Sequence, residues 1–254
     1  MGVLADKVAI VTGASSGIGR AAACLFASEG ASLVVVARRQ PALEEVLSNI
    51  EAAGGRAVAV VGDVSDEATA ARAVEVAVST FGGLDVSFNN AGTLGEMGPT
   101  PAISIAGWRQ ALDINLTSAF LGAKYQIPEM LKRGSGSVIF TSTVVGHTVG
   151  FPGAAAYAAS KSGLIGLTQT LAAEFGPQSV RINALLPGGT DTPMAAQMNG
   201  TPEAMAHVAS LHALKRIASP EELARAALFL ASDAASFMTG AALLVDGGVS
   251  IHRT

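Results

Sequence analysis

The sequence has little charge, few aromatic residues and a single cysteine. Of its 254 residues, 14% are charged and 5% are aromatic, and the formal net charge is −4. Because the basic residues are scattered, no nucleic-acid-binding face is expected. The lone Cys24 excludes an intramolecular disulfide and fits a reducing compartment. Its Ala-rich surroundings indicate a position in a helix core, not a nucleophile.

Signals for membrane insertion and export are also lacking. No uninterrupted apolar run reaches the roughly 18 residues that a spanning helix needs. Residues 1–7 lack the basic-then-apolar order of a signal peptide. We therefore expect a soluble, cytoplasmic protein that does not associate with membranes. Hydrophobic residues make up 50% of the chain, which favours extensive burial, in part between subunits.

Two kinds of catalytic site are not expected. The histidines, at positions 147, 207, 212 and 252, have no metal-ligand spacing with cysteine or acidic residues, so we predict no metal site. No Gly-x-Ser-x-Gly sequence points to a hydrolase. The chain also has no linker, charge block, low-complexity tract or short repeat.

What the sequence does have is a regular alternation of apolar, β-rich runs and amphipathic helical segments. The runs predict strands at residues 7–12, 32–37, 57–61, 84–88, 137–142, 180–186 and 242–245. Helices are predicted between them, including a long one at 108–131 and another at 155–175. This alternation predicts an α/β fold: one doubly wound Rossmann-type domain over residues 1–254, with a seven-stranded, mostly parallel sheet and helices on both faces.

Residues 190–215 carry only weak helical signals and are predicted to form a substrate-loop insertion. Met194, Met198 and Met205 lie in this segment. They could line a flexible lid over a substrate, or they could be soft filler in a core or a subunit contact. The apolar character of the segment suggests a substrate without high charge.

A glycine-rich turn follows the first predicted strand. Gly13, Gly17 and Gly19 form Gly-x-x-x-Gly-x-Gly between that strand and an Ala-rich helix. Such a turn lets backbone approach a pyrophosphate and presents free N–H groups at a helix start. An ordinary glycine turn is the alternative. Its place in the first βαβ unit favours a dinucleotide site.

The end of the second strand bears on which nicotinamide cofactor binds. An acidic residue there would bind the ribose hydroxyls of NAD. This chain instead has Ala37, followed by Arg38 and Arg39. Arg38 could hold a 2′-phosphate through a forked, charge-assisted contact, whereas the alternative is that both arginines are solvated. We therefore favour NADP(H) over NAD(H).

Tyr157 and Lys161 stand four residues apart, on one face of a predicted helix. A free phenol has a pKa of about 10, too high for a base near neutrality. A nearby positive charge lowers that value, so the pair is a plausible acid/base device. The alternative is an ordinary pair on an exposed helix face.

Together these motifs resemble the short-chain dehydrogenase/reductase family over essentially the whole chain. The matching residues are Thr12, Gly13, Gly17, Gly19, Asp63, the Asn-Asn-Ala-Gly of 89–92, Asn115, Tyr157, Lys161, Pro187, Gly188, Thr192 and the Val-Asp-Gly-Gly of 245–248. The resemblance implies an NAD(P)-dependent oxidoreductase that moves a hydride between the nicotinamide and a carbonyl or secondary alcohol. The alternative is a catalytically silent dinucleotide-binding regulator or scaffold. Such relatives are commonly tetramers, so a homotetramer is expected.

The resemblance also implies roles for individual residues. Tyr157 would exchange a proton with the substrate oxygen, and Lys161 would lower the pKa of Tyr157 and hold the nicotinamide ribose. Asn115 would support a water that links the lysine to solvent. The remaining residues expected at the cofactor are Gly13, Ser15, Ser16, Gly17, Ile18, Gly19, Arg38, Asp63, Val64, Asn90, Gly92, Pro187, Gly188, Thr190 and Thr192.

Two positions depart from the family pattern. Alignment from the fifth strand places Thr143 as the catalytic hydroxyl, but an extra residue before Tyr157 could give that role to Ser142. We favour Ser142 because its smaller side chain leaves more room for substrate. Ser16 stands where NADP-using members often carry a basic residue, which weakens the preference for NADP(H) without reversing it.

Overall fold

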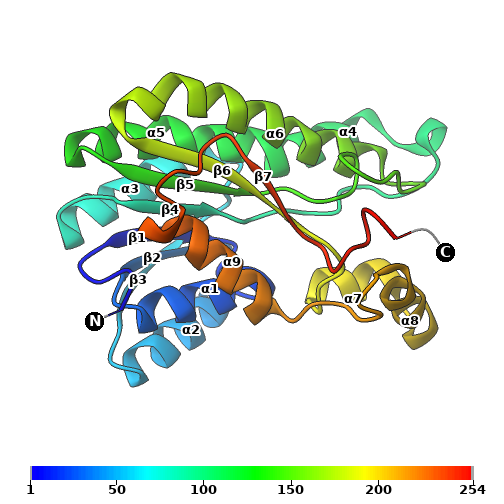
Figure 1. The fold of residues 1–254 in the computed structure, drawn as a ribbon, viewed down its shortest axis with the longest axis horizontal. Helices are drawn as coiled ribbons and strands as arrows, with labels where there is room; N and C mark the ends of the chain where they lie inside the picture. The colour runs from blue at the N-terminus through cyan, green and yellow to red at the C-terminus, as the bar shows by residue number, and fades with distance from the viewer. Residues whose placement is uncertain (1, 253–254) are drawn as a thin grey trace.

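The computed structural model describes residues 2–252, which form a seven-stranded sheet covered by helices on both faces (Figure 1). The strands are β1 (Val8–Thr12), β2 (Ser32–Ala37), β3 (Arg56–Val61), β4 (Val86–Asn89), β5 (Gly136–Thr141), β6 (Val180–Pro187) and β7 (Ala242–Val245). Their order is β3-β2-β1-β4-β5-β6-β7, and every neighbouring pair is parallel. The predicted doubly wound α/β fold is confirmed.

Helices follow almost every strand. The α-helices are α1 (Gly17–Ser28), α2 (Gln40–Ala52), α3 (Glu67–Phe81), α4 (Ile105–Leu112), α5 (Ser118–Arg133), α6 (Ala155–Phe175), α7 (Pro193–Asn199), α8 (Pro202–Leu211) and α9 (Pro220–Ala231). Short 3₁₀ turns occupy Thr100–Ala102, Gly176–Gln178 and Asp233–Ala235. Helices α1, α2 and α9 cover one face of the sheet, and α3, α5 and α6 cover the other (Figure 1).

The alternation of side chains along each strand builds two cores. On β1, Ala9 and Val11 pack against the α1/α9 side, whereas Val8 and Ile10 pack against the α3/α5 side. Both faces of the sheet are thus buried, which explains why the central strands are almost continuously apolar. The polar residues that interrupt this pattern lie at the strand ends.

The carboxyl ends of the strands meet at one edge of the sheet. The chain runs outward from β1 to β3 and then returns to β4 on the other side of β1. Ligands of such sheets bind in the crevice at this reversal. Helices α7 and α8 project beyond the same edge (Figure 1), because they follow the carboxyl end of β6.

Most predicted element limits agree closely with the structure, but residues 190–215, which carry only weak helical signals, contain α7 and α8, and a second difference is informative. The predicted helix at 108–131 is α4, a π-helical turn (Asp113–Thr117) and α5 in succession. A π turn inserts a residue into the helical ladder and often marks a functional position. Asn115 lies in this turn and is buried.

Candidate active site

A cavity of about 760 Å³ opens at the carboxyl ends of the strands. Of the residues predicted for catalysis or cofactor binding, those that line it are Gly13, Ser15, Ser16, Gly17, Ile18, Arg38, Asp63, Val64, Asn90, Gly92, Ser142, Thr143, Tyr157, Lys161, Pro187, Gly188, Thr190 and Thr192. Gly19 and Asn115 lie behind the cavity wall. The fold therefore brings together residues that the sequence separates by up to 179 positions (Gly13 to Thr192).

The glycine turn needs glycine at each of its three positions. Gly13 and Gly17 have φ of 67° and 51°, in the left-handed region. A Cβ on Gly19 would lie 2.3 Å from the carbonyl oxygen of Gly13, so this glycine permits close packing of the turn. Ser16 precedes α1 and makes no side-chain cap. The uncapped helix start at the cavity fits an anionic pyrophosphate.

Two arginines lie at the rim of the cavity beyond β2. Arg38, with its side chain 73% exposed, has a guanidinium nitrogen 3.8 Å from a carboxylate oxygen of Asp63. Hydrogen bonds from Ser65, more than the charge of Arg38, lower the pKa of Asp63. Arg39 donates a long hydrogen bond of 3.5 Å to the hydroxyl of Ser15. These cations lie where the anionic part of a dinucleotide would enter, so the residues present fit such a cofactor.

Asn90 joins three strand ends. Its backbone N–H donates to the Thr12 hydroxyl (3.0 Å), and its amide nitrogen donates to the Thr12 carbonyl (3.2 Å). Its amide oxygen accepts from the Thr141 hydroxyl (3.1 Å). Asn90 therefore fixes β1, β4 and β5 relative to one another while it lines the cavity.

Lys161 carries a buried ammonium group at the base of the cavity. The residue is 4% exposed, and its Nζ donates to the backbone carbonyl of Thr141 (2.7 Å). Burial lowers the pKa of Lys161 from 10.5 to about 8. A Cβ at Gly92 would lie 3.0 Å from both this Nζ and the amide oxygen of Asn115, so only glycine leaves room for both.

Asn115 binds the backbone of a neighbouring loop. Its amide oxygen accepts from the N–H of Thr93 (2.8 Å), and its amide nitrogen donates to the Thr93 carbonyl (2.9 Å) and the Ser160 hydroxyl (2.9 Å). The π turn thus attaches α6 to the loop after β4. In this structure, the Asn115 side chain is a scaffold for the base of the cavity.

The two candidate hydroxyls have different neighbours. Ser142 is buried and donates its hydroxyl to the backbone carbonyl of Lys161 (2.8 Å). Thr143 is instead the neighbour whose hydroxyl acts to lower the pKa of the Tyr157 phenol. The Ser142 hydroxyl proton is thus engaged in a structural bond, and both residues line the cavity, so the choice of catalytic hydroxyl stays a prediction.

The pKa of Tyr157 differs from the expectation. Burial raises it above its ordinary value of 10.0, and the hydrogen bond with Thr143 acts in the opposite direction. The expected lowering by Lys161 is not found in the protein alone, because the ammonium donates to the Thr141 carbonyl, not to the phenol. In the cofactor-free protein, the neighbour that favours the phenolate is therefore Thr143.

The other end of the cavity is mostly apolar. The lining residues that no sequence motif singles out include Leu94, Gln110, Ile114, Val149, Phe151, Leu211, His212, Val249 and His252. They come from loops and helix ends whose convergence no local pattern encodes. Met194 and Met198 also line the cavity, in agreement with a role in a lid. Met205 is not among the lining residues.

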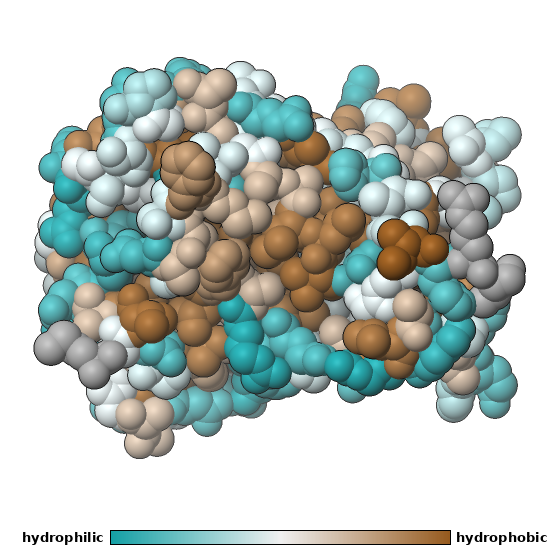
Figure 2. All heavy atoms as spheres, in the orientation of Figure 1, coloured by the Kyte–Doolittle hydropathy of each residue, from teal (hydrophilic) through white to brown (hydrophobic). Residues whose placement is uncertain are grey.

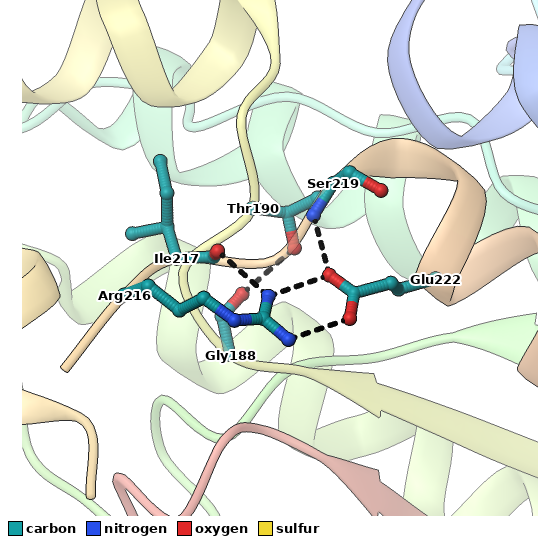
Figure 3. Close-up of polar contacts among 6 residues, drawn as sticks. All are labelled: Gly188, Thr190, Arg216, Ile217, Ser219 and Glu222. Carbon is teal, nitrogen blue, oxygen red and sulfur yellow. Dashed lines mark hydrogen bonds and ion pairs between the residues drawn. The ribbon is translucent and has the colours of Figure 1, made fainter. Parts of the chain in front are cut away.

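The segment that carries α7 and α8 is closed at its base. Ala218 donates its N–H to the carbonyl of Gly189 (2.8 Å) and accepts from the N–H of Asp191 (2.9 Å). Beside it, Arg216 forms a forked ion pair with Glu222, with both contacts at 2.7 Å (Figure 3). Glu222 also accepts from the Ser219 N–H at the start of α9. The two ends of the segment, at Gly189 and Ala218, are therefore held together beyond the end of β6.

This chain is similar to known proteins over almost its whole length. A family profile described as enoyl-(acyl carrier protein) reductase matches residues 13–250. Cyclohexanol dehydrogenase from Acinetobacter sp. (strain SE19) is 40% identical over 242 residues, which cover 95% of this chain and 94% of the relative. The chain belongs to the short-chain dehydrogenase/reductase family. It is an oxidoreductase of that family, and the alternative of a catalytically silent binding protein is not supported.

Two solved structures show both nicotinamide cofactors among the relatives. An assigned NAD(P)-dependent gluconate 5-dehydrogenase from Beutenbergia cavernae, with NADP at low occupancy, is 39% identical, with a TM-score of 0.91 and 97% coverage of both chains. Carveol dehydrogenase from Mycobacterium avium, in complex with NAD, is 30% identical, with a TM-score of 0.94 and coverage of 99% of this chain and 100% of the other. Membership of the family thus accounts for a nicotinamide cofactor, but it does not decide between NAD and NADP.

Two further features are absent from residues 2–252: a group of metal-ligating side chains and a membrane-spanning helix. Within residues 2–252, no three or more histidine, cysteine, aspartate or glutamate side chains are grouped as metal ligands. No helix in that range is long and apolar enough to cross a membrane.

We predict that Lys161→Met stabilises the cofactor-free protein. The change in pKa from 10.5 to about 8 corresponds to a burial cost of about 3 kcal/mol, and the lost bond to Thr141 offsets about 1 kcal/mol of it. Since the folded-state pKa is depressed, the cost is complete below about pH 8 and disappears as the pH rises to 10.5. Urea unfolding should therefore show a gain of about 2 kcal/mol at pH 7 that shrinks above pH 8. An unchanged or lower stability at pH 7 would contradict this.

Proposed function

We propose that this protein interconverts uncharged, cyclic secondary alcohols and ketones with NADP(H). The observation that carries the proposal is the cluster of buried Thr143 and Lys161 with half-buried Tyr157 beside a mostly apolar end of the cavity. Cyclohexanol dehydrogenase and carveol dehydrogenase are among its relatives by name. The absence of a charged side chain among Leu94, Ile114, Met194 and Met198 favours an apolar ring over a sugar acid.

In the proposed mechanism, Tyr157 is the proton donor and acceptor. The bound nicotinamide supplies the hydride chemistry, and the protein orients the reactants and handles the proton. Thr143 holds the substrate oxygen next to the phenol and stabilises the phenolate. Lys161 would place a positive charge near the nicotinamide ribose. Its hydrogen bond to the Thr141 carbonyl fixes the position of its ammonium group in the site.

The remaining predicted residues would hold the cofactor. We propose that the turn from Gly13 to Gly19 binds the pyrophosphate and that Asp63 and Val64 contact the adenine. Thr190 and Thr192, with Pro187 and Gly188, would hold the nicotinamide amide. Arg38 would bind the 2′-phosphate of NADP. Support comes from Ala37, which leaves no carboxylate at the end of β2 to bind ribose hydroxyls.

We further propose a cytoplasmic homotetramer of a single domain, with residues 190–215 as its substrate-loop insertion. Hydrophobic residues gather on the face where β7 and α9 lie (Figure 2). Phe229, Phe237 and Leu244 are exposed there, and β7 is an edge strand. Such a patch is typical of a subunit contact. The single cysteine supports the cytoplasmic location.

We expect Tyr157→Phe to lower turnover by about 10²- to 10⁴-fold, because the proton transfer loses its general acid/base. Affinity for NADPH should change less than about threefold. Tyr125→Phe is a matched control, since Tyr125 is the chain's other tyrosine and hydrogen-bonds to Glu67 away from the cavity. Reduction of NADP⁺ with cyclohexanol is the assay. Equal turnover of the Tyr157 variant and wild type would refute the mechanism.

The two hydroxyls can be separated by the pH dependence of alcohol oxidation. Thr143→Val removes the hydrogen bond that lowers the pKa of Tyr157, so the rising limb of the rate should move to higher pH and the rate should fall. Thr143→Ser should restore both. Ser142→Ala, which removes only the bond to the Lys161 carbonyl, should leave the limb in place. The assignment fails if Ser142→Ala shifts the profile more than Thr143→Val does.

We expect Arg38→Ala to weaken NADPH binding at least tenfold, the order of one charge-assisted contact. NADH binding should be unaffected. Arg56→Ala controls for the loss of one charge. Arg56 is exposed at the start of β3, whereas Arg38 follows the carboxyl end of β2 and lines the cavity. Titrations at equal salt measure both affinities. Wild-type protein that binds NADH as tightly as NADPH would overturn the cofactor assignment.

A further inference from the structure

His212 is a buried histidine with no role in the mechanism above. It follows α8 directly, lines the cavity and is 2% exposed. Its Nε2 lies 2.9 Å from the backbone nitrogen of Gly189, and its Nδ1 lies 2.8 Å from the carbonyl oxygen of Val208. Both ring nitrogens therefore have partners.

These partners determine the state of the ring. A backbone N–H can only donate, so Nε2 accepts from Gly189. A carbonyl can only accept, so Nδ1 carries the proton and donates to Val208. The imidazole is thus neutral, with one nitrogen attached to the helix and the other to the loop after β6.

The loop is shaped to receive this ring. A Cβ on Gly188 would lie 2.9 Å from Nε2, and a Cβ on Gly189 would lie 2.9 Å from Cε1. Neither glycine has a positive φ, so close packing, not backbone strain, explains glycine at both positions. The ring lies close to both, and at Gly188 a Cβ would also lie 2.8 Å from the backbone of Asp246. The next peptide is also held, because the Gly189 carbonyl accepts from the N–H of Ala218.

We propose that His212 is a positioning residue for the nicotinamide. Its ring holds the backbone of 188–190 in the conformation that receives the cofactor, and it attaches that backbone to the lid helix α8. This inference rests on the proposed function, in which the same backbone and Thr190 hold the nicotinamide amide. It adds a residue that does not itself touch the reacting atoms.

Amide variants can separate the two ends of the ring. In His212→Gln, the amide oxygen can reach the place of Nε2 and accept from Gly189. In His212→Asn, the shorter amide can replace only Nδ1 and its bond to Val208. Exposed His207, on the same helix, supplies the matched control His207→Asn.

The experiment is a titration of each full-length variant with NADPH, together with thermal unfolding without ligand. His212→Asn should bind NADPH about tenfold more weakly than wild type, the order of one lost buried hydrogen bond. His212→Gln should stay within about threefold of wild type, and His207→Asn should match wild type. The KM for the dinucleotide should rise more than kcat falls, with cyclohexanol as substrate.

Two results would overturn the inference while leaving the proposed function intact. The first is that His212→Asn binds NADPH as tightly as wild type. The second is that His212→Asn and His212→Gln lose the same amount of NADPH affinity, while the wild-type protein binds NADPH and turns over substrate. If one variant does not fold, the affinity of the other relative to wild type decides. Wild-type protein that binds neither NADPH nor NADH would refute the proposed function and this inference together.

Discussion

The bond between the Lys161 ammonium and the Thr141 carbonyl is the constraint around which the site is built. It joins α6 to the carboxyl end of β5 and places a charge where water is largely excluded. A buried charge disfavours the folded state, and a single backbone acceptor only partly compensates for this. The surrounding structure must therefore hold Lys161 in place. Gly92 gives it space, and Ser142 binds the backbone of the same residue.

The parallel sheet makes such a site possible without disturbing the core. Every strand in the sheet ends at the same edge, so polar residues placed just after an apolar strand converge in space. Asn90 shows how one side chain serves both purposes, since it joins β1 to β5 and also lines the cavity. The polar groups that the cofactor needs are thus largely the ones that hold the strand ends together.

Local residue patterns in the sequence predicted the limits of most helices and strands. They could not predict features that depend on how individual side chains and turns are placed in space. The limits of β2, α6 and β7 agree with prediction because each is bounded by clear changes in residue type. Periodicity could not reveal the π turn around Asn115, since one added residue hardly alters an apolar stripe. Counting along the chain could not separate Ser142 from Thr143 either. Both residues line the cavity and lie beside α6, and only the contact of the Ser142 hydroxyl with the Lys161 carbonyl distinguishes them.

His212 illustrates a further limit, because nothing in its local sequence distinguishes it from an exposed histidine. Its importance depends on contact with Gly189, 23 positions away. The segment that we propose as a lid, residues 190–215, has Thr192 near its start, where the threonine methyl carbon would lie 3.0 Å from a Cβ on Gly17. Just after its end, Arg216 pairs with Glu222 (Figure 3). The two ends of the proposed lid therefore lie against the glycine turn and against α9. A cofactor that orders the glycine turn and the loop after β6 would also order the lid, so substrate should meet a completed pocket only after the dinucleotide has bound.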